Sequence, residues 1–321
     1  MAMPRFARTL PLAALLLAPL AAGCKPDLGS PTSLVTGPRI LAVRGTPAES
    51  KQGGSVTYDL LAVDVTGTNP TPDIGWAICT EADPPAEQND VSDACLTIPD
   101  DGSPAPTYTA NIPNNACMVF GPQSPTPKKG QPAARPADPD TTGGYYQPVK
   151  ADWESAGQLA FALERITCPL ISAPSADAAQ FAANYTPNNN PTLANLVLDP
   201  YGSVTILYTA GQASPGPAAV SAGQTLTIQA DFTADSAETF LFWDVVSLTL
   251  IDQRESLRVS WFATGGSFEH DAGGRAADDT ATFTDNTWTA PTTPGTVYLW
   301  AVLNDSRGGV DFASAQINVT P

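Results

Sequence analysis

The sequence has little of what catalytic and nucleic-acid-binding proteins rely on. Its 321 residues include one histidine, His270, and 15 basic against 32 acidic residues, for a formal net charge of −17. A chain this acidic does not hold nucleic acid or an anionic lipid surface by charge. It contains no Gly-x-Ser-x-Gly nucleophile turn, no phosphate-binding glycine loop and no Cys-x-x-Cys pair. The usual sequence signals for hydrolysis, nucleotide binding and zinc binding are therefore missing.

The first 24 residues have the parts of an export signal. Arg5 and Arg8 supply a positive start, residues 10–20 are a short apolar segment, and small residues (LAAG) precede Cys24. The segment resembles a bacterial lipobox, in which the cysteine is diacylated and becomes the new N-terminus. The resemblance implies attachment to the cell envelope through acyl chains, at about 0.8 kcal/mol per buried methylene. Lys25 is consistent with the outer membrane, and an ordinary secretory signal with a chance cysteine is the alternative.

Short β-type runs separated by turn residues dominate the rest of the chain, which is typical of all-β sandwiches. Residues 55–65 follow Gly53-Gly54, residues 225–233 follow Gly223-Gln224, and both runs alternate apolar with polar side chains. A tryptophan follows each run, Trp76 in the first half and Trp261 in the second. The pattern thus returns after about 170 residues, which indicates a divergent duplication of one β-sandwich. Chance similarity between unrelated strands is the alternative.

The second half carries the clearer family resemblance. It contains WFATGGSF (261–268), TWTAP (287–291) and GTVYLWAVLNDSRGG (295–309). These stretches resemble the middle and end of bacterial immunoglobulin-like and PKD-like modules. The whole chain resembles two-domain surface lipoproteins of myxobacterial type. The resemblance implies an all-β fold with two immunoglobulin-like β-sandwich domains in tandem, and it transfers no catalytic residues.

The expected organisation follows from these patterns. We predict a signal peptide (1–23), a polar stalk (24–37), a first domain (38–186) with a Pro-rich insertion, and a second domain (191–321). A short helix is expected at 175–185 with Ser175 as its cap, before the boundary sequence TPNNNP. In the second domain we expect the core to be filled by Trp261, Trp288 and Trp300.

Four further cysteines, Cys79, Cys95, Cys117 and Cys168, all lie in the first domain. An even number of cysteines in an exported protein predicts disulfides. Three connectivities remain open, and we favour Cys79–Cys95 with Cys117–Cys168, since the first pair closes a short acidic loop. The long insertions of this domain explain why it needs disulfides. A metal site is disfavoured because His270 lies in the other domain.

Ligand-binding candidates are few. Phe242 and Trp243 lie in an insertion (234–253) and could form a sugar-stacking platform, with burial of Trp243 as an equally weighted alternative. Carboxylate pairs such as Asp100–Asp101, Asp138/Asp140 and Asp278–Asp279 are ascribed to turns and solubility. A weak calcium hypothesis remains at Asp271/Asp278/Asp279 or Asn304/Asp305. A loop histidine such as His270 is more often inert than catalytic.

These observations favour a lipid-anchored envelope protein with a non-catalytic structural, adhesion or ligand-display role. The expected partners are the membrane, through the N-terminal lipid, and an envelope protein or polysaccharide. No cofactor, metal or nucleic acid is expected. A polysaccharide-binding module that uses the Trp243 region is the second hypothesis, and a loop-based hydrolase is the third.

Overall fold

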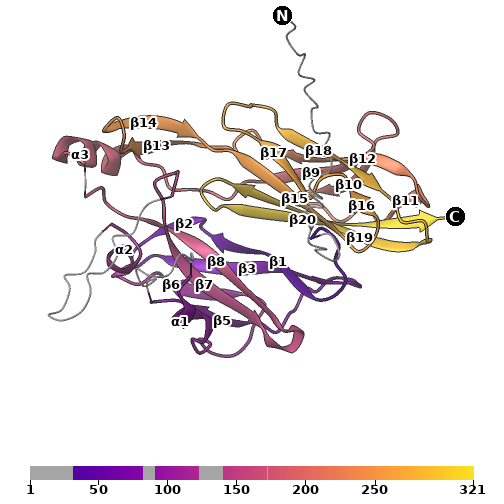
Figure 1. The fold of residues 1–321 in the computed structure, drawn as a ribbon, viewed down its shortest axis with the longest axis horizontal. Coiled ribbons are helices and arrows are strands. Elements are labelled where there is room, and N and C mark those ends of the chain that lie inside the picture. The colour runs from indigo at the N-terminus through magenta and orange to yellow at the C-terminus, as the bar shows by residue number, and fades with distance from the viewer. Residues whose placement is uncertain (1–31, 82–90, 123–139, 172) are drawn as a thin grey trace, which may run out of the picture. The chain divides into compact units, whose positions relative to one another are not determined.

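The structure is a computed structural model that describes residues 32–81, 91–122, 140–171 and 173–321 (Figure 1). The leader, Cys24 and most of the Pro-rich insertion lie outside the described residues. Residues 32–321 belong to one compact unit. Within the described ranges, no helix has the length and apolar character that a membrane crossing requires.

Two four-stranded sheets form the first sandwich. The first sheet contains β1 (Arg39–Thr46), β3 (Ser55–Asp64), β4 (Gly67–Thr68) and β6 (Tyr108–Asn111). The second has the order β2 (Glu49–Lys51), β8 (Gln158–Thr167), β7 (Tyr145–Trp153) and β5 (Gly75–Ile78). Helices α1 (Asp93–Leu96) and α2 (Ala116–Val119) and a 3-10 turn (Glu154–Ala156) lie in its connections. The pairing is antiparallel except between β2 and β8.

Two five-stranded sheets form the second sandwich. One has the order β10 (Thr205–Thr209), β9 (Leu193–Leu198), β12 (Thr225–Phe232), β18 (Phe283–Thr289) and β16 (Ser267–Phe268). The other has the order β11 (Ala218–Ser221), β20 (Val310–Thr320), β19 (Gly295–Asp305), β15 (Leu257–Ala263) and β17 (Ala272–Arg275). A separate hairpin, β13 (Thr239–Asp244) with β14 (Thr249–Arg254), projects beside helix α3 (Ser175–Asn184) (Figure 1).

The two sandwiches repeat one strand order. In the first, β1 pairs with β3, which also pairs with β6, while the hairpin β7–β8 lies between β5 and the parallel edge strand β2. In the second sandwich, the places of β1, β3 and β6 are taken by β9, β12 and β18. The places of β5, β7, β8 and the parallel edge strand β2 are taken by β15, β19, β20 and the parallel edge strand β11. Trp76 on β5 and Trp261 on β15 are both buried. The fold class predicted from the sequence, all-β with two immunoglobulin-like sandwiches in tandem, is confirmed, and the repeated order is what a duplication predicts.

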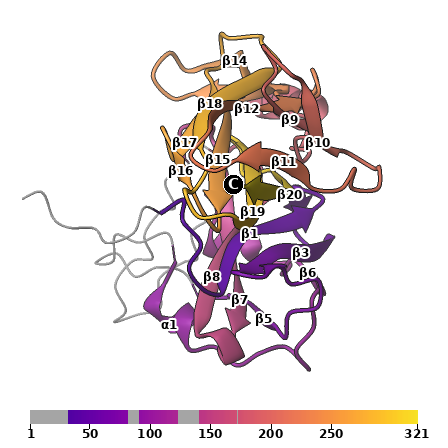
Figure 2. The same cartoon turned by 90° about the vertical axis from the view of Figure 1, so that its right-hand side faces the viewer.

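Alternation along the strands decides which face is buried. On β12, Ile228, Ala230 and Phe232 are buried, while the residues between them are partly exposed. On β3 the alternation ends at Leu61, because that residue and Val63 face the second sandwich. A third apolar cluster therefore lies between the two sandwich cores. Figure 2 shows β1 and β3 of the first sandwich beside β19 and β20 of the second.

The prediction for one of the three core tryptophans, Trp300, needs correction. Trp261 and Trp288 lie in the core of the second sandwich, but Trp300 lies in the cluster between the sandwiches. Its indole Nε1 donates to Thr68 Oγ1 at 2.9 Å. Because β19 is a central strand with both faces covered, alternate residues on it enter different cores. The sequence pattern shows two buried faces there but does not say what covers each.

Two local expectations also differ from the structure. The sequence predicts a polar stalk up to residue 37, yet Val35 is 1% exposed and its N–H donates to the carbonyl of Ala263 on β15. In helix α3, Ser175 is the first helical residue and not the cap, which is Pro174 without a side-chain hydrogen bond. The boundary predicted at 186–191 stays a prediction.

Candidate functional site between the two sandwiches

A buried network of charges joins the two sandwiches, with Glu49 on β2 at its centre. Its carboxylate lies 3.2 Å from Arg165 Nε on β8 and 3.8 Å from Arg307 Nη1 in the β19–β20 turn. Tyr185 Oη donates to it at 2.8 Å, and the N–H of Asn188 donates at 2.9 Å. Because these groups come from both sandwiches and the segment between them, one carboxylate ties three parts of the chain together.

Arg307 is fully buried and each nitrogen of its guanidinium has an acceptor. Its Nε donates to Glu255, Nη2 donates to Glu238 at 2.7 Å, and Nη1 donates to the carbonyl of Thr186 at 2.9 Å. The guanidinium carbon lies 4.5 Å from the centroid of the Phe240 ring. Arginine is suited to this position because its planar group donates in several directions and stacks on aromatic faces.

Arg165 holds the start of β7 from the other side. Its Nη1 donates to Thr142 Oγ1 at 2.7 Å and to Tyr146 Oη at 2.9 Å. Tyr146 in turn donates to Asp140 at 2.6 Å, and Asp140 also accepts from the N–H groups of Thr142 and Gly144. The network therefore fixes the residues that precede β7 as well as the contact between sandwiches.

The acids in this region outnumber the two arginines. Burial raises the pKa of Glu255 to about 7, with the Asp305 charge acting in the same direction and Arg307 opposing it. Burial also raises the pKa of Asp305, which accepts from the N–H groups of Arg307 and Gly309. Buried ion pairs contribute little net stability, but removing one partner is costly. The network therefore defines how the sandwiches meet more than it strengthens the fold.

A cavity of 520 Å³ opens beside the network, between β1 and β8 on one side and the β19–β20 turn on the other. Its apolar walls include the side chains of Leu41, Val43, Phe161, Leu163, Val302 and Val310. Its polar lining comprises Asp140, Tyr146, Glu164, Asn304, Asp305 and Ser306. The volume is in the range of small-molecule sites, which are mostly apolar with a few polar groups.

Glu164 is the unusual member of this lining. It is 3% exposed, and its Oε1 has no hydrogen-bond partner, as is also true of the buried Tyr58 hydroxyl. Burial raises the pKa of Glu164 to about 9, although the Tyr58 hydroxyl acts in the opposite direction, and the charge of Glu49 raises it further. The carboxyl is therefore neutral at pH 7.

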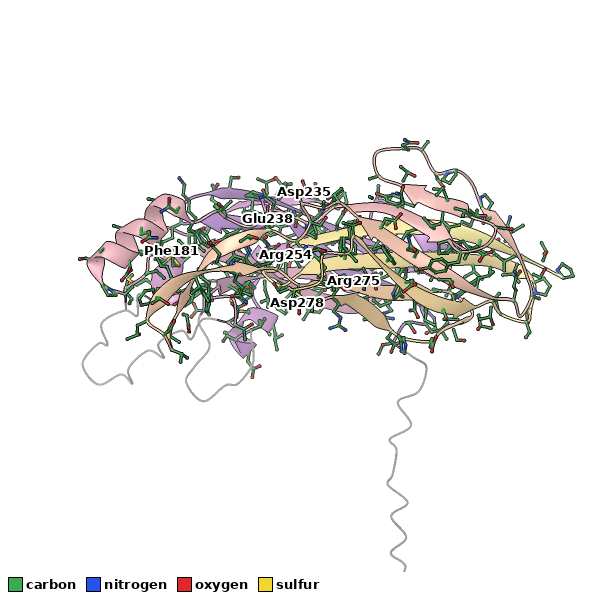
Figure 3. The ribbon with its side chains drawn as sticks, turned by 90° about the horizontal axis from the view of Figure 1, so that it is seen from above. Phe181, Asp235, Glu238, Arg254, Arg275 and Asp278 are labelled. Atoms are coloured by element: carbon green, nitrogen blue, oxygen red, sulfur yellow. A yellow bond between two sulfur atoms is a disulfide. The ribbon has the colours of Figure 1, made fainter. Side chains whose placement is uncertain are left out.

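The candidate metal positions do not form a cluster. Among the residues described, no three His, Cys, Asp or Glu side chains are placed to share a metal ion. Asp279 pairs with Arg275 at 3.1 Å, and Arg254 donates to the backbone of the same loop. Figure 3 shows Arg254 and Arg275 near Asp278, so this loop is held by arginines. The side chain of His270 is 71% exposed, with Glu269 4.0 Å away.

The structure pairs the cysteines in the favoured way. Cys79 is bonded to Cys95 and Cys117 to Cys168, with Cα–Cα distances of 5.5 and 5.6 Å. All four are buried in the first sandwich. Cys24 lies outside the described residues, so its lipidation stays a prediction.

The aromatic platform needs correction. Trp243 is 7% exposed, and the half-buried ring of Phe242 packs against Gly143, where an added Cβ would lie 3.2 Å from it. A buried indole presents no face to a sugar. The hairpin β13–β14 instead exposes aliphatic side chains, which the sequence reading overlooked: Val245, Val246, Leu248 and Ile251.

A second cavity, of 650 Å³, lies between helix α3 and the β2–β8 edge. Phe181 and Tyr185 line it, with ring centroids 4.6 Å apart. Figure 3 shows Phe181 on α3, away from Glu238, Arg254 and Arg275. Its lining is mainly apolar, and its polar members include Glu49.

Sequence reasoning missed the network and the Glu164 cavity. One signal was available, because the chain has only 15 basic residues and few can serve as partners for its acids. Arg307 in the turn sequence NDSRGG and Arg165 within an apolar strand stand out on that ground. Neither pattern identifies the partner, since Glu49, Arg165 and Arg307 meet only when the two sandwiches dock.

Comparisons with known proteins give no family. No protein-family model and no curated protein matches the chain. Among solved structures, it is similar to the D00-D0 domain of intimin, at 11% identity over 89% of this chain and 99% of that one, with a TM-score of 0.23. It is also similar to the Yersinia pseudotuberculosis adhesin InvE (11% identity, 87% of this chain, 58% of that one, TM-score 0.25). The S-layer protein SbsC, domains 4 and 5, matches at 11% identity over 88% of this chain and 100% of that one, with a TM-score of 0.20. At these TM-scores the similarities carry no argument about partners or activity.

Proposed function

We propose that this chain is a lipid-anchored protein of the bacterial outer membrane with a non-catalytic role in structure, adhesion or ligand display. The observation that carries the proposal is the buried contact of Glu49 with Arg165 and Arg307, which couples the two sandwiches. A display protein benefits from such coupling because it holds its surfaces at a constant spacing.

Other contacts between the sandwiches support a rigid pair. Arg44 on β1 pairs with Asp59 at 2.6 Å and with Asp311 on β20 at 2.7 Å, and it lies over the Phe312 ring. The apolar cluster around Trp300 fills the adjoining interface. A contact that combines an apolar centre with buried ion pairs resists relative motion of domains better than a polar linker alone.

The ends of the described unit support display as well. Val35 and Ser33 exchange backbone hydrogen bonds with Ala263 at one end of β15, while β14 joins β15 at its other end, before Leu257. The exposed tip of the hairpin, with Val246 88% exposed, is therefore at the opposite end of β15 from the first described residues (Figure 1). An exposed tip at the opposite end of β15 from Ser33 and Val35 suits a display role.

The rigidity of the contact between the two sandwiches can be tested by double electron-electron resonance, which measures distances between spin labels. Spin labels on Leu159→Cys and Val204→Cys, both at exposed positions on different sandwiches, should give one narrow distance distribution. Adding Arg307→Met should broaden it. A broad distribution in the otherwise unchanged chain would overturn the rigid-display proposal. A pair within the second sandwich, Val204→Cys with Arg258→Cys on β15, both at exposed positions, controls for label motion.

A further inference from the structure

We propose that the cavity between β1, β8 and the β19–β20 turn binds a small organic cation, an amine with an apolar body, whose ammonium group is held by Glu164. This inference goes beyond the structural or display role above. It rests on the charges that line the cavity, on one unsatisfied oxygen and on the size of the space.

The lining has one sign of charge. Three carboxyl groups, those of Asp140, Glu164 and Asp305, line the cavity, and its lining within the described ranges contains no lysine, arginine or histidine. Two of these carboxyls already have a cation nearby, since Asp140 lies 3.9 Å from Arg165 Nη1 and the charge of Arg307 acts on Asp305. Cationic ligands are favoured where carboxyls meet low-dielectric walls.

Glu164 is the lining carboxyl that can still accept a hydrogen bond. Asp140 accepts from Thr142, Gly144 and Tyr146. Asp305 accepts from Asn188 and from two backbone N–H groups of its own turn. Glu164 Oε1, by contrast, has no partner at hydrogen-bond distance although the residue is 3% exposed, and the Tyr58 hydroxyl that acts on its pKa is unpaired as well. Buried polar groups are nearly always paired, so an unpaired one indicates a missing partner.

The geometry favours an organic cation over a metal ion. In the described part of the chain these carboxyls do not form a group that could share a metal ion. A single ammonium needs only one carboxylate, and the aliphatic walls suit an attached alkyl or aryl body. Phe161 also lines the space and favours a cation near its ring, whereas the Tyr146 ring already has the Arg165 guanidinium 5.7 Å from its centroid. The 520 Å³ volume accommodates a molecule of modest size.

Binding of such a cation should be accompanied by the release of a proton from Glu164. The pKa of Glu164, raised to about 9 in the free protein, leaves its carboxyl protonated at pH 7. An ammonium group placed against it favours the ionised form and lowers that pKa. The carboxyl then loses its proton to solvent, and the ligand's positive charge takes its place. Binding at pH 7 should therefore release close to one proton.

The test is isothermal titration of the mature chain with n-hexylammonium at pH 7, in phosphate and in MOPS, neither of which is a primary ammonium. We expect saturable one-to-one binding, with binding enthalpies that differ by about the difference between the ionisation enthalpies of the two buffers, multiplied by one proton. The neutral analogue 1-hexanol and the anion hexanoate should bind at least tenfold more weakly. Carbon-13 NMR of the glutamate carboxyls should show one buried group shifting on ionisation.

Substitutions separate this site from non-specific attraction to an acidic protein. Glu164→Gln should weaken hexylammonium binding at least tenfold and abolish proton release. Glu154→Gln, the same change at an exposed position on the same sandwich, should leave both unchanged. The carboxyl NMR shift on the unsubstituted chain decides the matter if Glu164→Gln does not fold. Equal affinity for hexanol, unaltered binding in Glu164→Gln, or no saturable binding of methyl-, hexyl- and phenylethylammonium would overturn the proposal without affecting the distance measurements.

Discussion

Arg307 Nη1 lies 3.8 Å from Glu49 Oε2, so a turn of the second sandwich and an edge strand of the first share one buried carboxylate. Both side chains are at most 1% exposed. Neither charge has water to replace a lost partner, so disrupting the contact affects both sandwiches. We expect the described unit to unfold in a single transition for this reason.

Replacing Arg307 by methionine should lower the free energy of unfolding by about 3–5 kcal/mol at pH 7, because Glu255 is left buried without its cation, while Glu49 keeps only Arg165. This loss of stability should be smaller at pH 5, because Glu255 is then protonated and no longer leaves an unpaired buried charge. Urea denaturation measures both values. Arg258→Met, at an exposed position on β15, should change stability by about 0.5 kcal/mol or less. A loss below about 1 kcal/mol for Arg307→Met would show that the network is not the coupling element.

Stability should fall as the pH rises from about 5 to 9 because of Glu164. The folded pKa, about 9, exceeds the ordinary value of 4.5, so the stabilisation is complete below the unfolded pKa and is lost as the pH rises through the folded one. One proton corresponds to a slope of about 1.4 kcal/mol per pH unit. Glu164→Gln should reduce the slope between pH 6 and 8 by up to that amount. Parallel pH profiles of the two proteins would refute this account.

The two disulfides should differ in what they contribute. Cys117 and Cys168 are 51 residues apart and Cys79 and Cys95 are 16 apart. In the chain-entropy model, replacing the first pair by alanines costs about 4 kcal/mol and replacing the second costs about 3 kcal/mol, because the longer loop restricts the unfolded chain more. Denaturation under non-reducing conditions measures the difference. A larger loss from the shorter loop would contradict the ranking.

The strand patterns could be predicted from the sequence because a two-residue period reports directly on one buried face. This held for Val56 and Tyr58 on β3 and for the buried positions of β12. It failed where a second body covers the other face, as at Leu61 and Trp300. The charged network could not be predicted for the same reason, since the partners of its residues depend on how the sandwiches dock. The repeat of tryptophans was informative because it identified equivalent strands without requiring that docking.

Burial of Trp243 can be tested against a neighbour on the same hairpin. Trp243→Ala should cost about 3–5 kcal/mol, as expected for a buried indole that is 7% exposed. Val246→Asn, at a position 88% exposed, should change stability by about 0.5 kcal/mol or less. Thermal unfolding of both variants makes the comparison. Similar small losses would mean that the indole is free to meet a ligand.

Lipidation of Cys24 is tested by metabolic labelling with a palmitate analogue. The unsubstituted chain should be labelled and remain with the membrane fraction, because acyl chains supply its attachment. Cys24→Ala should abolish labelling and leave the protein in the soluble fraction or unprocessed. Lys25→Ala should still be labelled. Labelling that persists in Cys24→Ala would exclude this residue as the anchor.

The two backbone hydrogen bonds that join Ser33 and Val35 to Ala263 have a mechanical consequence. Tension applied through the N-terminal segment would load β15 of the second sandwich before it reached β1. The sandwich that comes later in the sequence would then bear the first stress, and the earlier one would be shielded until that short pairing parted. A pull on the tether would thus release a few residues of slack before either hydrophobic core was strained.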